Sequence, residues 1–267
     1  LDDFIEPAES ILTKAFSKLV AVDSRRWIKF LTDILPRFSC ELAASLSDFE
    51  KRMLQMFYIT VFQEAADWRS HTTQANMQLL ADSPIMMHEL NELLSFNLER
   101  IDFIDQPVPL GFDCPLDLHC TYTRDQILIA MDYMTPKNVR EGVKWLPDKQ
   151  VDVFFITLNK ADKDYSPTTM YNDYSINESL FHWQSQSTTS DTASTGQRYI
   201  NHRQRGSKVV LFVREFKQDS IGAAPYTCLG TAAYVKHTGS KPMNITWHLD
   251  QPIPAKYLRK TNKLVVG

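Results

Sequence analysis

The sequence predicts an α+β protein with a helical first part and a mostly β second part, and three observations support this class. Apolar residues recur at spacings of three and four through the first hundred residues or so, which is the period of amphipathic helices. Short apolar runs rich in Val, Ile and Phe, separated by turn signals, follow from residue 151 onward. Between these parts, residues 105–115 hold three prolines and a glycine, which interrupt both helices and sheets. We therefore expect a helical subdomain at 1–104, a linker at 105–117 and a mostly β domain at 118–267.

The first part is expected to form a helical bundle. Ser47 and Glu50 have the spacing of a capping box, in which the two side chains satisfy backbone N–H groups at the start of a helix. Pro36 ends another helix, because proline has no backbone N–H and clashes with the preceding turn. The predicted helices are 9–20, one from Asp23 or Ser24 to Leu35, one from Ser47 through Trp68, and one from Ser83 to Arg100.

The second part begins with a short helix and continues as strands. Thr123 and Gln126 repeat the capping-box spacing, and Ile127, Leu128 and Met131 form an apolar stripe behind them. Several short strands after one or two helices predict a mixed, strongly bent sheet or a partly closed barrel. The predicted strands are residues 151–158, 179–186, 197–202, 208–215, 226–236 and 244–249.

Charge is distributed unevenly along the chain. Residues 1–118 have ten Lys and Arg against nineteen Asp and Glu, whereas residues 119–267 have nineteen against thirteen, and the net charge is −3. A basic part of this kind suggests a polyanionic partner, and ordinary scatter between two halves of a protein is the alternative. The sequence has no apolar run of eighteen residues and no basic signal-peptide region at its start, Leu1-Asp2-Asp3. We expect a cytoplasmic segment of a longer protein with no membrane contact.

Several classes of site are not indicated by the sequence. The four cysteines offer no second pair at zinc-site spacing, so reduced thiols and no bound metal are expected. The phosphate loop of nucleotide hydrolases, the glycine fingerprint of dinucleotide-binding folds, the serine elbow of esterases and the zinc helix of metalloproteases are all absent. We expect no cofactor and no nucleotide hydrolysis by this segment itself.

The stretch 181–190 is the strongest indication of binding. Phe181, His182 and Trp183 precede hydroxyl and amide side chains, a mixture that can stack on a planar group and hydrogen-bond to its edge. The alternative is a strand with Phe181 and Trp183 buried, running into a Ser/Thr loop. Residues 160–174 interleave lysines, hydroxyls and three tyrosines, and residues 197–205 add three arginines beside Tyr199.

Lysine and arginine attract phosphates regardless of base sequence, while aromatic rings stack on bases. A solvated hairpin with arginines lying along the surface is the competing interpretation. The candidate nucleic-acid-binding residues are Lys160, Lys163, Tyr171, Tyr174, His182, Trp183, Gln184, Ser185, Gln186, Arg198, Tyr199, Arg203, Arg205 and Trp247.

One pattern resembles a nuclease site. Glu215 and Lys217 end an apolar strand as Glu-x-Lys, the spacing of restriction-type nucleases in which the carboxylate binds Mg²⁺ and the lysine activates water. Such a site also needs an acidic residue on a neighbouring strand. Residues 198–205 contain none and Asp191 lies in the Ser/Thr loop, so a charged strand end is the competing interpretation.

Several runs of the second part have a specific order of residues. The most specific run is Phe181-His182-Trp183-Gln184-Ser185-Gln186-Ser187. The others are residues 118–124, 140–143, 157–160, 165–174, 211–215 and 241–247. Together these runs resemble a family of bacterial domains of otherwise unassigned function, which follow superfamily-two DEAD/DEAH-type helicases.

The resemblance implies a DNA-handling accessory domain of a defence-type helicase, with the helicase core of the same polypeptide as a partner and no catalytic residue to carry over. Bent β-domains attached to restriction-type proteins commonly read a modified or flipped base by stacking and edge hydrogen bonds. We therefore expect a non-catalytic, modified-base-reader-like DNA-binding domain. One alternative is a docking or regulatory module with Trp183 and Tyr174 as interface anchors. The other is a magnesium-dependent nuclease using Glu215 and Lys217.

Overall fold

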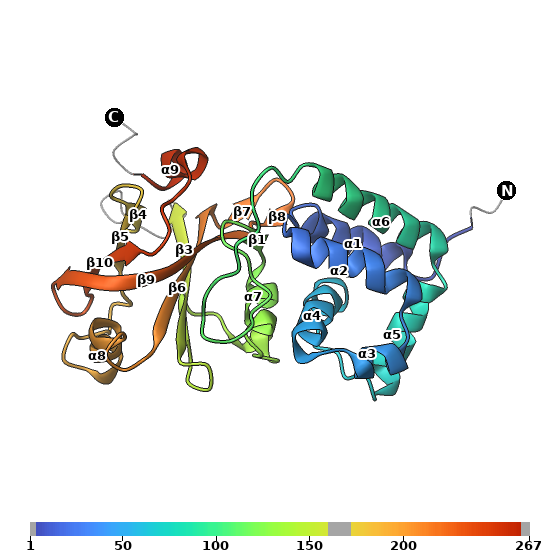
Figure 1. The fold of residues 1–267 in the computed structure, drawn as a ribbon, viewed down its shortest axis with the longest axis horizontal. Helices are drawn as coiled ribbons and strands as arrows, with labels where there is room; N and C mark the ends of the chain where they lie inside the picture. Colours follow the sequence, from blue (N-terminus) through green and yellow to red (C-terminus); the bar gives the residue numbers. More distant parts are fainter. Residues whose placement is uncertain (1–3, 160–171, 263–267) are drawn as a thin grey trace. The chain divides into compact units, whose positions relative to one another are not determined.

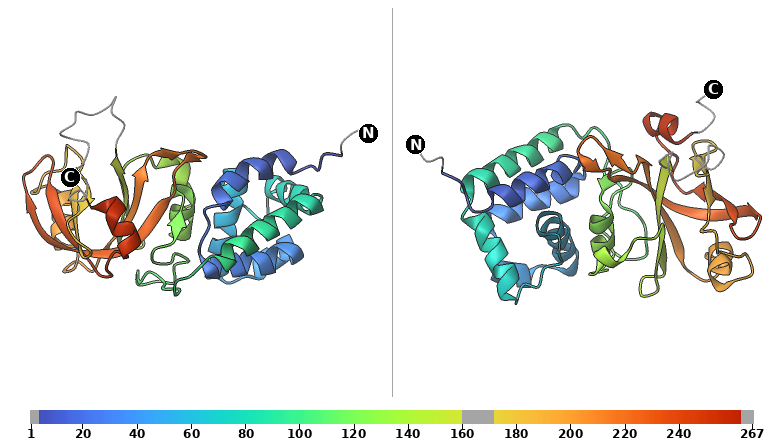
Figure 2. Two further views of the ribbon diagram at one scale, coloured as in Figure 1. Left: turned by 90° about the horizontal axis from the view of Figure 1, so that it is seen from above. Right: turned by 180° about the vertical axis from the view of Figure 1, so that it is seen from behind.

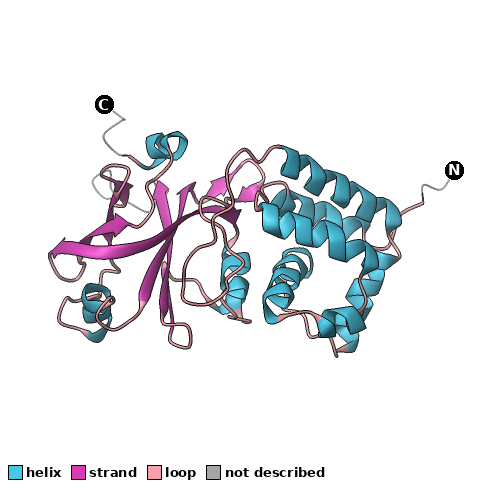
Figure 3. Ribbon diagram, in the orientation of Figure 1, coloured by secondary structure: helices cyan, strands magenta, loops and turns pink. Residues whose placement is uncertain are grey.

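The computed structural model describes residues 4–159 and 172–262, which divide into two compact units (Figure 1). The described parts of Leu1–Pro107 and Asp113–Val139 form the first, called here the helical unit. Val108–Phe112 and the described part of Arg140–Gly267 form the second, the sheet unit. Helices make up most of the first unit and a mixed sheet makes up the second, so the predicted α+β class is confirmed (Figure 3). Residues 118–139 group with the helical unit, although they were expected in the β domain. The predicted domain limits stay a prediction.

The helical unit follows the capping signals of its sequence. The side chains of Ser24, Ser47 and Thr123 accept hydrogen bonds from the first turns of α2, α4 and α7, and those of Ser47 and Thr123 belong to complete capping boxes. Trp27 is fully buried and donates its indole N–H to the Met53 carbonyl at 2.9 Å. The elements are α1 (Glu9–Leu19), α2 (Arg25–Ile34), η1 (Leu35–Arg37), α3 (Cys40–Ser45), α4 (Asp48–Phe62), α5 (His71–Ala81), α6 (Pro84–Glu99), β1 (Thr121–Tyr122), α7 (Arg124–Ala130) and η2 (Pro136–Asn138).

The predicted helix from Ser47 through Trp68 is too long. Helix α4 ends at Phe62, where Gln63 takes a left-handed conformation with φ of 63°. The Gln55 side chain then holds the returning loop by hydrogen bonds to both the N–H and the carbonyl of Ala66, each 2.7 Å long. The Trp68 ring returns to the Tyr58 ring at 5.7 Å, so a loop residue mimics the apolar spacing of a longer helix.

The sheet unit holds an open, mixed sheet (Figure 2). Its strand order is β2-β3-β6-β9-β10-β5-β4. Strands β3 and β6 are parallel, and the other neighbouring pairs in this order are antiparallel. The mixed sheet was predicted, but the sheet does not close into a barrel, because β2 and β4 end the order. The elements are β2 (Val143–Leu146), β3 (Val151–Asn159), β4 (Tyr174–Ser175), β5 (Leu180–Gln184), α8 (Ser194–Asn201), β6 (Lys208–Phe216), β7 (Gln218–Asp219), β8 (Gly222–Ala223), β9 (Tyr226–Thr238), β10 (Asn244–Leu249) and α9 (Ala255–Thr261).

Buried aromatic residues gather on one face of this sheet, and we call this cluster the aromatic core. Its rings are those of Phe154, Phe181, Trp183, Tyr199 and Trp247. Phe154 lies at its centre, with its ring centroid 4.3 Å from that of Trp183 and 5.5 Å from that of Trp247. Tyr199 and Ile200 of α8 and Tyr257 and Leu258 of α9 pack against the same cluster. Both helices therefore cover the aromatic side of the sheet.

The strand predicted at 197–202 is wrong, because these residues belong to helix α8 and its C-cap. Tyr199 and His202 are buried and lie three residues apart, which is a helical spacing. Gly196 allows the helix to begin close to the preceding loop, since a β-carbon at this position would lie 2.1 Å from the Ser190 carbonyl oxygen. None of the helices in the described ranges combines the length and apolarity that a membrane span requires.

A carboxylate distant in sequence caps helix α6. Glu6 is buried, and its two carboxylate oxygens accept hydrogen bonds from the backbone N–H groups of Ile85 and Met86, both 2.8 Å long. Two orphan donors of the first turn are satisfied in this way, and a negative charge lies at the positive end of the helix.

We expect Glu6→Ala to lower the free energy of unfolding of the helical unit by about 1–3 kcal/mol, because it leaves two buried N–H groups without acceptors. Urea unfolding followed by helical circular dichroism measures this change. Glu89→Ala, at an exposed position of the same helix, is the matched control and is expected to stay within about 0.5 kcal/mol of the unchanged protein. Equal effects of the two substitutions would contradict the capping role.

Candidate nucleic-acid interface

Strands β5 and β10 separate aromatic from polar side chains. Phe181, Trp183, Ile245 and Trp247 are buried in the aromatic core, whereas the alternate residues project from the opposite side of the sheet. We define the polar face by six residues of β4, β5, β9 and β10: Tyr174, His182, Gln184, Lys236, Asn244 and Thr246.

Four of these residues form one row across the sheet. Tyr174 lies opposite His182, His182 opposite Thr246, and Thr246 opposite Lys236. Neighbouring strands lie about 4.8 Å apart, so the row is about 14 Å long. It places a phenol, an imidazole, a hydroxyl and an ammonium group side by side.

The two rings of the row are stacked. The Tyr174 and His182 ring centroids are 4.8 Å apart and their planes differ by 17°. Nδ1 of His182 lies 2.7 Å from the Asn172 carbonyl oxygen, and since a carbonyl can only accept, Nδ1 carries the proton in this contact. The hydrogen bond fixes the orientation of the imidazole within the stack.

An amide pair lies next to the row. The Gln184 side-chain amide donates to the Asn244 side-chain oxygen at 3.3 Å. Behind it, the buried Asp173 carboxylate accepts the Gln184 backbone N–H at 2.9 Å and holds the end of β5 in place. Primary amides carry both donors and acceptors, which is the chemistry that reads the edge of a base.

Trp183, Tyr199 and Trp247 lie in the aromatic core, with 5 %, 3 % and 0 % of their surfaces exposed. The predicted binding role of these rings stays a prediction, and it would require them to leave the core. Ser185 is also buried, and its hydroxyl accepts the Met243 backbone N–H at 2.8 Å. Gln186 is exposed in the following loop. Lys160, Lys163 and Tyr171 fall outside the described residues.

The predicted arginines do not lie on the polar face. Arg198 of α8, a helix on the aromatic side, makes a bidentate ion pair with Asp152, with N–O distances of 2.8 and 2.9 Å. Its guanidinium also lies 4.4 Å from the centre of the Trp145 ring. Arg203 reaches Asp250 at 3.4 Å, and Arg205 is exposed in the turn after α8. The structure therefore separates these cations from His182 and Gln184.

Residues 116–260 match a family described as a domain of unknown function, DUF3427. The chain belongs to this family. The match confirms the expected membership in an uncharacterised domain family, while the association with helicases stays a prediction. No curated protein matches the chain.

Three members of the polar face of this DUF3427 domain were missed in the sequence: Lys236, Asn244 and Thr246. The period of two in the predicted strand 244–249 was the available signal, because Ile245 and Trp247 as core residues place Asn244 and Thr246 on the other face. Lys236 could not be found in this way, since the register shifts between Thr246 and Trp247 on the β9 side.

A second polar group of the domain ties the Ser/Thr loop to β9. The Tyr234 hydroxyl lies 2.5 Å from Nδ1 of His237, and Nε2 of the same ring lies 3.2 Å from the Asp191 carboxylate. The hydrogen bond with His237 is the main cause that lowers the pKa of Asp191, while burial raises the pKa of Tyr234. The Asp191 carboxylate can only accept, so Nε2 of His237 carries a proton in this contact. In the neutral ring Nδ1 is then the acceptor, and the Tyr234 hydroxyl is the donor.

Glu215 lies near the end of β6, and Lys217 directly follows this strand. The parallel register places Thr157 opposite Arg214 and Asn159 opposite Phe216, so Glu215 lies beside Leu158 on the neighbouring strand. Across residues 4–159 and 172–262, no group of three or more His, Cys, Asp and Glu side chains is arranged to hold a metal ion. The nuclease alternative stays a prediction.

The ion pair with Arg198 stabilises the ionised form of Asp152, whose carboxyl group is fully buried. Burial raises the pKa of Asp152 above its ordinary value of 3.8, and the hydrogen bonds and charge of Arg198 oppose this rise. With Arg198 in place, the buried carboxylate is balanced by a partner held over Trp145.

We expect Arg198→Ala to lower the free energy of unfolding of the sheet unit by about 3–5 kcal/mol, because it leaves a buried carboxylate without its partner. The folded pKa of Asp152 would then lie further above the unfolded value, so the loss is small while the group is protonated in both states. It grows as the pH rises above 3.8 through the folded pKa.

Urea unfolding of this variant at about pH 4 and pH 7 measures that dependence. Arg203→Ala removes an exposed ion pair and is the control, with an expected loss below about 1 kcal/mol. A loss for Arg198→Ala that shrinks as the pH rises would contradict the assigned role.

Proposed function

We propose that this domain binds DNA through its polar face and serves a larger DNA-handling protein as a non-catalytic recognition module. The observation that supports this proposal most directly is the Tyr174–His182 stack beside the Gln184–Asn244 amide pair. Aromatic rings and amides on one sheet face are the side chains with which proteins hold bases that are not paired.

The arrangement favours an unpaired or flipped base over a base inside a duplex. Bases within a duplex expose their edges in the grooves, but their planes are covered by neighbouring bases. A base that has left the stack can use the rings of Tyr174 and His182 for its plane and the amide of Gln184 for its edge. A modified base would be recognised in the same way, through hydrogen bonds to its altered edge.

A positive charge beside the rings and amides is expected to attract the phosphates of the DNA. Lys236 is exposed at the end of the row, where an ammonium group can contact a phosphate of the same strand. A helicase core of the same polypeptide is the partner that the sequence resemblance implies, and it would deliver the unpaired strand.

We expect Lys236→Glu to weaken binding of a fluorescein-labelled single-stranded oligonucleotide for every base sequence tested and to reduce the salt slope by about 1. Fluorescence anisotropy at several salt concentrations measures both effects. Lys260→Glu is the matched control, since it makes the same charge change on exposed α9, which packs on the aromatic side. Equal losses for the two variants would show nonspecific attraction and contradict the assignment of the face.

We expect His182→Ala to weaken binding of the single strand by about 1–3 kcal/mol, the contribution of one stacked base, while affinity for plain duplex changes less. Parallel titrations with single-stranded, duplex and base-modified oligonucleotides measure this preference. Thermal unfolding of the variant serves as the folding control. Unchanged affinity for all three forms of DNA would exclude the polar face as the binding surface.

A further inference from the structure

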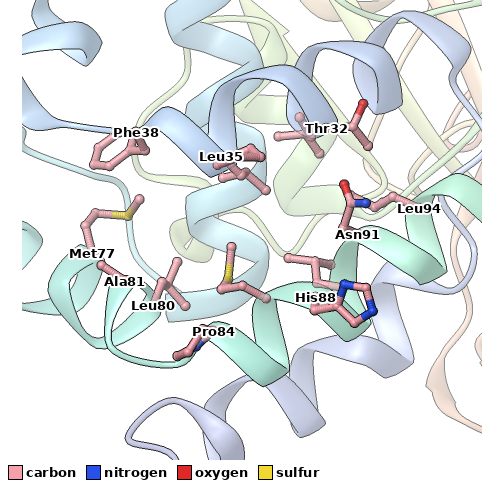
Figure 4. A pocket seen from close by; sticks show the side chains of 14 residues that line it. Thr32, Leu35, Phe38, Met77, Leu80, Ala81, Pro84, His88, Asn91 and Leu94 are labelled. Atoms are coloured by element: carbon pink, nitrogen blue, oxygen red, sulfur yellow. The ribbon is translucent and has the colours of Figure 1, made fainter.

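An apolar groove and a buried histidine lie outside the proposed DNA-binding surface. The groove, of about 600 Å³, belongs to the helical unit and lies between α2 and η1 on one side and α5 and α6 on the other (Figure 4). Nothing in residues 4–159 and 172–262 indicates which molecule would occupy it. The histidine, His202, belongs to the sheet unit, and its contacts define a chemical role.

His202 bridges two backbone segments of the sheet unit. It directly follows α8 and is 3 % exposed. Its Nδ1 lies 3.2 Å from the Ser207 carbonyl oxygen, and its Nε2 lies 3.1 Å from the backbone nitrogen of Tyr234 on β9. The antiparallel register of β6 and β9 pairs Val209 with Ala232. Continued by two residues, this register would place Ser207 opposite Tyr234, so the imidazole lies between two backbone groups that would otherwise face each other.

These contacts require a neutral ring. A carbonyl oxygen can only accept a hydrogen bond, so Nδ1 of His202 carries the proton that faces Ser207. A backbone N–H can only donate, so Nε2 must be unprotonated to accept from Tyr234. A second proton, on Nε2, would break the bond to Tyr234, remove the acceptor of its N–H and place a charge in a buried site.

Burial and nearby cations both favour the neutral ring. Burial is the main cause that lowers the pKa of His202 below its ordinary value of 6.5. The cations of Arg203 and Lys208 also lower this pKa, whereas the hydrogen bond to Ser207 and the carboxylate of Asp250 raise it. The folded protein therefore loses stability at this site as the pH falls below 6.5, and the loss stops growing below the folded pKa.

A second imidazole attaches the start of the segment that carries α8, residues 191–207. Nε2 of His237 donates to Asp191, and Nδ1 of the same ring accepts from the Tyr234 hydroxyl. Tyr234 therefore holds both ends of the segment, one through its N–H and His202, the other through its hydroxyl and His237. A proton on His237 keeps the bond to Asp191, because Nε2 already donates there. Acid therefore releases the His202 end and not the Asp191 end.

The ion pair of Arg198 with Asp152 attaches the middle of the segment to β3. Beyond it, Tyr199 covers the aromatic core, with its ring centroid 5.6 Å from that of Phe154 and 5.5 Å from that of Trp183.

Residues 199–207 are attached by the packing of Tyr199, by the exposed ion pair of Arg203 with Asp250 and by the His202 bridge. Carboxylates stay ionised at about pH 6, so the bridge is the one of these three attachments that a proton breaks there.

We propose that residues 199–207 form a lid on the aromatic core, which a proton on His202 opens. The neutral ring holds the end of α8 on β9. The protonated ring releases this end, and Tyr199 then leaves Phe154 and Trp183 uncovered. The lid lies on the aromatic side of the sheet, so its opening is independent of DNA binding by the polar face.

Hydrogen exchange of the whole chain, measured for single amides by NMR and corrected for the intrinsic effect of pH, tests the lid. The amides of Arg205 and Ser207, bonded within the lid, and that of Tyr234 report its opening. We expect them to exchange about threefold faster or more at about pH 5 than at about pH 7.5, relative to the amides of β3. An unchanged ratio would overturn the proposal, and so would an equal acceleration in β3, which indicates global unfolding.

His202→Gln tests the same step without a titratable ring. The glutamine side-chain oxygen can accept from the Tyr234 N–H and takes up no proton, so the pH dependence of the lid amides should be lost. His248→Gln is the matched control, since His248 is exposed on β10, and it should keep this dependence.

A pH dependence that persists in His202→Gln, or that is lost equally in His248→Gln, would contradict the role of His202. Circular dichroism establishes that both variants are folded. If His202→Gln does not fold, the exchange measurement on the unchanged chain decides the proposal.

Discussion

The burial of alternate aromatic residues on β5 and β10 is the constraint on which the sheet unit depends. Phe181 and Trp183 of β5 and Trp247 of β10 pack with Phe154 on one side of the sheet. Successive side chains of a strand point to opposite faces, so the aromatic core commits His182, Gln184 and Asn244 to the other side. A slip of one residue in the register would exchange the two faces and expose the tryptophans to water. The polar face is therefore held in place by the core behind it.

This constraint could largely be predicted from the sequence. The interpretation of Phe181 and Trp183 as buried strand residues that run into a Ser/Thr loop is confirmed, and so are the capping boxes at Ser47 and Thr123. These features are local, because a cap or a period of two depends on residues within one turn or one strand. The two elements that were predicted wrongly, the strand at 197–202 and the helix through Trp68, depend on contacts between residues distant in the sequence. Tyr199 turns toward the core in a helix and not in a strand, and Trp68 returns from a loop to pack on Tyr58.

The candidate site was less predictable than the fold, because charges were counted without their partners. Arg198 belongs to the basic part of the chain, but its charge is balanced by Asp152, which lies 46 positions earlier in an apolar run. Arg214 is held similarly, by the Thr157 hydroxyl at 2.9 Å and the Ala224 carbonyl at 3.1 Å. The Asp152 carboxylate balances the charge of Arg198, whereas the neutral partners of Arg214 only occupy some of its donors and hold its guanidinium in place. The excess of cations in this part therefore overstates the field that a nucleic acid meets, and single exposed residues such as Lys236 matter more.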